Sequence, residues 1–140
     1  MEQSYFTEAR DINPKSINTK VINLWFHMLK YKHLLDQQLS DWIGTIVRDR
    51  RILSEEIPRM KTNDRRELYN NQQRLYEKAV IELEKEAKRR GECIHGHISP
   101  YIITELELEN SLDETKMRMF FKKYMKSQEV ITFLTNNNYI

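Results

Sequence analysis

The sequence predicts an all-α fold: an elongated antiparallel pair of long helices, or helical hairpin, with two shorter C-terminal helices packed on it. Three observations lead to this expectation. The 140 residues include only three glycines and three prolines, too few for the many tight turns of a β fold. Charged residues make up 31% and hydrophobic residues 39%, a balance typical of long helices with wide solvated faces. Apolar residues also recur at helical spacing over long stretches.

The length fits one domain, so residues 1–140 are expected to form a single helical domain. Residues 1–15 read as an N-terminal arm with a short turn of helix around Tyr5 to Arg10. That turn should end at Asn13-Pro14, because proline disfavours helical dihedrals in the residue before it. The first long helix is then expected over residues 16–53, capped by Ser16.

The composition also indicates the cellular compartment of the protein. The arm is polar and does not resemble a signal peptide, and Cys93 is the single cysteine. The longest apolar run, Leu24 to Leu29, is far below the roughly 20 residues that a membrane span requires. We therefore expect an intracellular, soluble protein that makes no membrane contact.

The first long helix carries more apolar residues than one antiparallel partner can cover. Apolar residues recur at alternating spacings of four and three residues, and Lys32 occupies one of these positions. The apolar members are Val21, Trp25, Met28, Leu35, Leu39, Trp42 and Ile46. Further apolar residues widen this stripe. Excess apolar surface on a small helical protein indicates self-association or a protein partner. The residues expected to bind that partner are Trp25, Phe26, Met28, Leu29 and Trp42.

The second long helix is expected over residues 62–91. Thr62-Asn63-Asp64 supplies capping residue types at its start, and Gly91 follows a basic last turn at its end. The remaining chain, residues 99–135, is expected to form the C-terminal helical pair.

The first member of that pair is ambiguous between two structures. Ser99-Pro100 reads as the cap and first turn of a helix, whereas alternating apolar and acidic residues over 101–109 equally describe a strand. Helix is favoured over strand. The second member follows a capping box at Ser111 to Glu114 and carries Met117, Phe120, Phe121, Tyr124, Gln128, Ile131 and Leu134 at three-four spacing.

Two basic clusters are candidate nucleic-acid contacts. Arg118, Lys122 and Lys126 repeat every four residues, as in the recognition helix of a helix-turn-helix DNA-binding regulator. Lys88, Arg89 and Arg90 gather at the end of the second long helix. The net charge of only +2 makes a nucleic-acid partner compatible with the sequence without requiring one.

Cys93, His95 and His97 alternate in an extended stretch, so their side chains could converge on a zinc ion. A fourth ligand is missing locally, and a polar loop after a helix is the favoured interpretation. No cofactor or metal is therefore expected.

Arg90 and His95 are separated by four residues, a spacing that resembles the arginine–histidine motif of HEPN-type ribonucleases, a family of small all-α domains. The resemblance implies transition-state charge stabilisation by Arg90 and proton transfer by His95 in a dimer cleft. The chain departs from the family pattern at Gly91, because the family usually has a polar residue after the arginine. The function that the sequence favours is a non-enzymatic interaction or adaptor protein that forms a homo-oligomer and binds a partner protein, with the ribonuclease and the DNA-binding regulator as alternatives.

Overall fold

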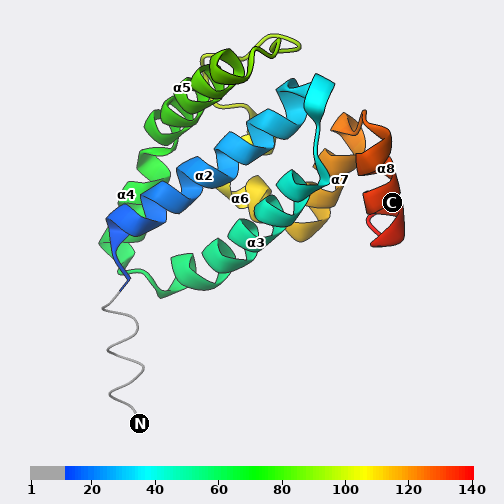
Figure 1. The fold of residues 1–140 in the computed structure, drawn as a ribbon. Coiled ribbons are helices and arrows are strands. Elements are labelled where there is room, and N and C mark those ends of the chain that lie inside the picture. Colours follow the sequence, from blue (N-terminus) through cyan, green and yellow to red (C-terminus); the bar gives the residue numbers. More distant parts are fainter. Residues whose placement is uncertain (1–11) are drawn as a thin grey trace.

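A computed structural model describes residues 12–140, and these contain seven α-helices and no strand (Figure 1). The all-α expectation is confirmed. The turn expected around Tyr5 to Arg10 lies outside the described residues. The first described helix, α2 (Pro14–His33), begins earlier than predicted, because Asn13 and not Ser16 caps it by accepting a hydrogen bond from the Lys15 backbone amide at 2.9 Å.

The predicted first long helix over residues 16–53 is wrong, because it is two helices. The helix α2 ends at Leu34, which has φ −102° and ψ 66°, and a 3₁₀ turn follows at Leu35–Gln37. The helix α3 (Ser40–Glu56) then folds back antiparallel along α2 (Figure 1). A short 3₁₀ turn at Ile57–Arg59 closes it.

The predicted second long helix is correct at both ends but interrupted once. The helix α4 (Thr62–Asn70) is followed directly by α5 (Gln72–Arg90), with Asn71 between them. Gly91 ends α5 in the left-handed conformation with φ 66°, and the Glu92 amide donates to the Ala87 carbonyl at 3.0 Å. Together α4 and α5 run in the same general direction as α2, so the expected antiparallel pairing of the two long helices is also wrong (Figure 1).

The C-terminal segment contains three helices and neither of the two structures expected for residues 101–109. Residues Thr104–Leu106 form a 3₁₀ turn, and α6 (Leu108–Ser111) is a single turn. The helix α7 (Glu114–Tyr124) is capped by Asp113, whose side chain accepts from the Lys116 amide at 2.9 Å. The helix α8 (Gln128–Asn136) is capped by Ser127, so the single helix predicted after Ser111 is divided.

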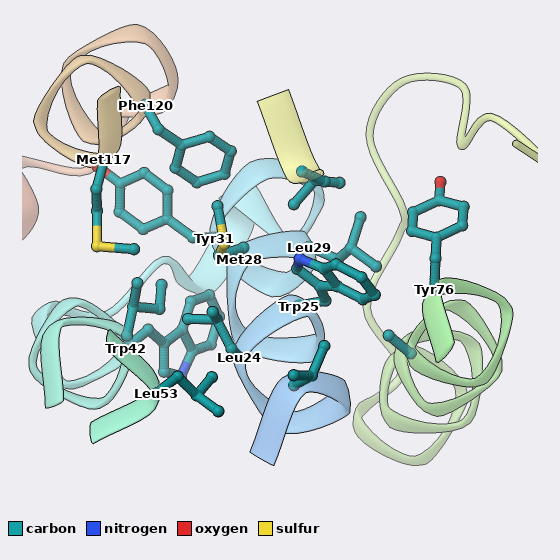
Figure 2. Close-up of a cluster of buried hydrophobic side chains, with 14 of the residues drawn as sticks. Leu24, Trp25, Met28, Leu29, Tyr31, Trp42, Leu53, Tyr76, Met117 and Phe120 are labelled. Carbon is teal, nitrogen blue, oxygen red and sulfur yellow. The ribbon is translucent and has the colours of Figure 1, made fainter. Parts of the chain in front are cut away.

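The core is built around α2, which has neighbours on several sides. Figure 2 shows Trp42 and Leu53 of α3 beside Leu24, Met117 and Phe120 of α7 beside Tyr31, and Tyr76 of α5 on the opposite side of α2. Nine residues of α2 are buried. A helix enclosed in this way is apolar over much of its circumference, which explains the wide apolar pattern in the sequence.

Candidate functional site

The residues predicted to bind a partner belong to the core. Trp25 is 0% exposed, Met28 and Leu29 are 1% exposed, and Trp42 is 5% exposed. Their assignment to a surface is therefore corrected: the break after His33 lets α3 cover the part of α2 that the sequence left without a neighbour. Only Phe26 of this set keeps partial exposure.

The surface that does expose apolar side chains is elsewhere. Large apolar side chains that are exposed among the described residues are Tyr69, Ile81, Tyr101, Met119 and Ile140. Met119 is 63% exposed and lines a hollow of about 470 Å³ between α7 and the segment 104–110. We call this hollow the α7 groove, and its lining residues are Thr104, Glu105, Asn110, Lys116, Met119, Phe120 and Lys123.

The α7 groove has an apolar floor between two amines. Phe120 is 4% exposed and packs edge-on against Tyr124, with ring centroids 4.9 Å apart. Met119 lies beside Phe120 on α7, and Lys116 and Lys123 lie about one turn before and after them. The floor and both amines therefore come from one helix.

The opposite wall is fixed by hydrogen bonds within residues 104–111. The side-chain Nδ2 of Asn110 donates to the Thr104 carbonyl at 2.7 Å, and the Ser111 hydroxyl donates to the Leu106 carbonyl at 2.7 Å. Trp25 Nε1 donates to the same Ser111 hydroxyl at 3.0 Å. The wall is thus anchored directly to the core of the molecule.

Charged groups join the two walls of the α7 groove. Lys116 Nζ donates to Asn110 Oδ1 at 2.6 Å, and Lys123 Nζ lies 3.7 Å from Glu105 Oε2. Glu105 also accepts from the Tyr124 hydroxyl at 2.6 Å and from Lys32 Nζ at 3.1 Å. The amines are the outward-facing charges, since Lys116 and Lys123 are exposed while Glu105 is half-buried.

These contacts decide the ionisation of Glu105. Partial burial acts to raise the pKa of this carboxyl, but the hydrogen bonds from Tyr124 and Lys32 and the charges of Lys32 and Lys123 outweigh it and lower the pKa below its usual value. Glu105 is therefore a carboxylate at neutral pH. In the same contact, burial and the hydrogen bond to Glu105 raise the pKa of Tyr124.

The predicted recognition row does not lie on one helix. Lys126 follows the end of α7 at Tyr124, so it is out of line with Arg118 and Lys122. Arg118 donates to the Asn138 carbonyl at 3.2 Å and its guanidinium lies 5.0 Å from the centre of the Tyr139 ring. Lys122 alone is an exposed basic residue of this row on α7. The predicted row on one helix is therefore wrong, and DNA binding stays a prediction.

The structure places Arg90 and His95 against the same short turn, 35–37. Arg90 Nη2 donates to Gln37 Oε1 at 2.9 Å, and His95 Nε2 lies 3.0 Å from Asp36 Oδ1. The Asp36 contact was not visible in the sequence, because it joins residues from two distant segments.

The other nitrogens of Arg90 contact acids. Its Nε lies 2.8 Å from Glu92 Oε1 and its Nη1 lies 3.4 Å from Glu86 Oε2. A phosphate that approached this guanidinium would meet two carboxylates, which repel it. Ribonuclease activity stays a prediction, and these ion pairs weigh against it.

The neighbouring basic residues are exposed but partly compensated. Arg89 contacts Glu86 at 2.8 Å, whereas Lys88 is exposed at the end of α5.

Among residues 12–140, no three His, Cys, Asp or Glu side chains are grouped so that they could hold a metal ion. The weak zinc candidate of Cys93, His95 and His97 is therefore corrected, since His95 is turned to Asp36.

Sequence reasoning missed the α7 groove because each of its walls is ordinary alone. Phe120 is part of the apolar stripe predicted for its helix, and Lys116 and Lys123 are lysines on the same helix. The signal that could have indicated the groove is Met119, an apolar residue one step off that stripe and between two lysines. The opposite wall, 104–110, could not be placed without the fold.

The fold and the α7 groove define a small helical domain with an open amphipathic concavity. The chain matches no protein-family model, no curated protein and no solved structure significantly. Within the described part of the chain, no helix has both the length and the apolar character needed to span a bilayer. The function of the protein is therefore inferred from the geometry of the α7 groove.

Proposed function

We propose that this protein is a non-enzymatic interaction module that binds a partner protein in the α7 groove. The observation that carries this proposal is the apolar floor of Met119 and Phe120, placed between the amines of Lys116 and Lys123. Exposed methionine is characteristic of adaptable protein-binding surfaces, because its unbranched side chain adjusts to its ligand.

The chemistry of the groove favours an acidic amphipathic helix as the bound segment. Such a helix would lay apolar side chains on Met119 and Phe120 and acidic side chains toward Lys116 and Lys123. Glu105 is already compensated by Lys32 and Lys123, so the rim presents net positive charge. A basic helix would meet these amines with like charge.

The groups in the groove support binding rather than proton transfer. The lowered pKa keeps Glu105 ionised and engaged with Tyr124 and Lys32, which makes it a poor general acid at neutral pH. Lys116 donates to Asn110 as part of the wall.

A direct experiment is fluorescence anisotropy with two labelled peptides, each an amphipathic helix of about four turns. Both carry leucine on one face, one with flanking glutamates and the other with flanking lysines. The proposal predicts a Kd of about 10–100 µM for the acidic peptide and at least about tenfold weaker binding of the basic one. Equal binding of the two peptides, or none of the acidic one, would overturn it.

Variants on α7 locate the binding. Met119→Ser should weaken the acidic peptide about tenfold through lost apolar contact, and Lys123→Ser about threefold through a lost exposed ion pair. Lys122→Ser is the matched control, because this exposed lysine is adjacent in sequence but does not line the groove. If Lys122→Ser weakens binding as much as Lys123→Ser, the peptide binds elsewhere.

A further inference from the structure

A second exposed apolar side chain lies on a different face of the molecule. Ile81 is 49% exposed near the middle of α5, on a face that is otherwise charged. Beside it, a groove of about 330 Å³ separates α5 from α2 and is lined by Ile22 and Phe26 as well as Ile81. Figure 2 shows that α5, the helix of Tyr76, lies on the opposite side of α2 from α3.

The charges around Ile81 are arranged in a self-complementary order. Glu77 lies four residues before Ile81 and Lys85 four residues after it. Lys78 lies three residues before Ile81 and Glu84 three residues after it. All four side chains are exposed.

We propose that a second copy of this chain covers the face, with the two α5 helices crossing antiparallel at Ile81. A two-fold axis at Ile81 makes residues at equal distances before and after it face each other across the interface. Glu77 then faces Lys85 of the other copy, and Lys78 faces Glu84. Symmetry doubles each contact, giving four ion pairs around two isoleucines.

The contacts that these residues make within their own chain allow this arrangement. Gln73 donates to Glu77 at 3.0 Å, and Lys85 lies 3.7 Å from Glu82. Both contacts are exposed and lie along α5, so they compete only weakly with an ion pair to a second copy.

The charged residues farther from Ile81 along α5 set a lower limit on the crossing angle between the two α5 helices. Arg74 and Lys88 lie seven residues before and after Ile81, so two-fold symmetry places like charges opposite each other. Packed helices cross at about 20–50°, which separates side chains progressively with distance from the crossing point. The inner, opposite charges are thus closer together than the outer, like charges, and the arrangement is attractive overall.

A standard interface buries about 800 Å² on each partner, close to a tenth of the 8488 Å² surface of this chain. Ile22 and Phe26 lie beside the crossing and extend the apolar part of the contact from α5 onto α2. The α7 groove is lined by other residues, so the dimer does not depend on the proposed function.

Sedimentation equilibrium of the full chain at low salt tests the proposal through reversed charges. The wild type is expected to dimerise with a Kd of about 1–50 µM. Glu77→Lys alone and Lys85→Glu alone should each weaken dimerisation about tenfold, because each change creates two like-charge pairs. An equimolar mixture of the two variants should associate again, since 77 and 85 are then complementary between the two chains.

The double variant E77K/K85E should also dimerise about as well as the wild type. Lys88→Glu is the matched control, because it makes the same change of charge as Lys85→Glu on the same helix but removes the two like-charge pairs with Arg74, so it should not weaken the dimer. A monomeric wild type at about 100 µM, or a mixture that stays as weak as its components, would overturn the proposal. Met119→Ser should leave dimerisation unchanged, which separates this result from failure of the α7 groove.

Discussion

A single buried side-chain amide, that of Gln38, joins the break between α2 and α3 to the break between α7 and α8. Its Nε2 donates to the Tyr31 carbonyl at 2.8 Å and to the Tyr124 carbonyl at 2.7 Å. Its Oε1 accepts from the amides of Lys126 at 2.8 Å and Ser127 at 3.1 Å. Gln38 is 2% exposed, so these backbone groups have little access to water as an alternative partner.

Replacing Gln38 by leucine should therefore destabilise the fold by about 3 kcal/mol, because several buried backbone groups lose their partner. Urea unfolding monitored by circular dichroism measures this change. Gln37→Leu is the matched control: Gln37 is exposed, and its contact with Arg90 is at the surface. Losses of the same size for Gln37→Leu and Gln38→Leu would contradict this account of Gln38.

Buried histidines make the stability depend on pH. Burial lowers the pKa of His33, although its hydrogen bond to the His95 carbonyl and the charge of Glu105 act in the opposite direction. The pKa of His27 is also lowered, chiefly by burial. A base whose folded pKa is below its unfolded value binds its proton more readily in the unfolded chain, so protonation favours unfolding.

We therefore expect stability to fall as the pH drops below the ordinary histidine pKa of 6.5. His33 should contribute to this loss between about pH 7.5 and about pH 5, because the pKa of its imidazole is lowered in the folded chain. Urea unfolding across this range should give a shallower pH dependence for His33→Gln and the shallowest for H27Q/H33Q. If His33→Gln keeps the wild-type slope, His33 does not cause the effect.

At the scale of the elements, helix starts and ends with specific capping chemistry were predictable. The end at Gly91 agrees with the sequence, because a glycine in the left-handed conformation determines it. The start at Thr62 also agrees, but not for the predicted reason, since Lys61 stands at the N-cap and makes no side-chain capping hydrogen bond. The cap of α7 was misplaced by two residues, because Ser111 and Asp113 are both capping types and Ser111 is instead used by Trp25.

The break between α2 and α3 was not predictable in the same way. The segment 34–39 contains neither glycine nor proline, and its leucines continue the apolar spacing across the break. The one irregularity was Lys32 in an apolar slot, which lies where α2 is about to end. The energy that favours the break comes from packing α3 against α2 and from Gln38, and periodicity does not report either contribution.

Substituting alanine for two glycines tests the helix assignments, because the two changes should affect the free energy of unfolding in opposite directions. A Cβ added at Gly91 or at Gly44 meets nothing within 4 Å, so only the backbone conformation matters. Gly91 has φ 66°, and Gly91→Ala should cost about 1 kcal/mol. Gly44 is inside α3, and Gly44→Ala should add about 0.5–1 kcal/mol.

Thermal unfolding of the two variants compares these changes directly. The Tm of Gly91→Ala should fall and that of Gly44→Ala should rise. A rise for both variants would mean that Gly91 does not hold the left-handed cap of α5.

At the scale of the whole molecule, the two proposed surfaces are separate. The α7 groove is lined by α7 and residues 104–110, whereas the dimer face lies on α5 and α2. A dimer would carry two α7 grooves, and a partner with two acidic helices could bind both of them. The second contact would then form at a raised effective concentration.

Only part of this picture could be derived from the sequence. The expectation of an interaction protein came from excess apolar residues, yet most of those residues are core, since α3, α5 and α7 pack against α2. Two of the side chains that remain exposed, Met119 and Ile81, are isolated apolar residues in charged stretches of sequence. Their significance depends on which segments lie beside them, and that information is tertiary.

Methyl NMR of the methionines, recorded while the acidic amphipathic peptide is added, reports at atomic resolution whether the peptide binds in the α7 groove. The Met119 methyl signal should shift with saturation, while the signals of Met28 and Met60, which are buried and do not line the α7 groove, should shift much less. The lysine-flanked peptide should leave Met119 unchanged. A Met119 signal that does not move up to about 1 mM acidic peptide, or that moves equally with both peptides, would contradict the account.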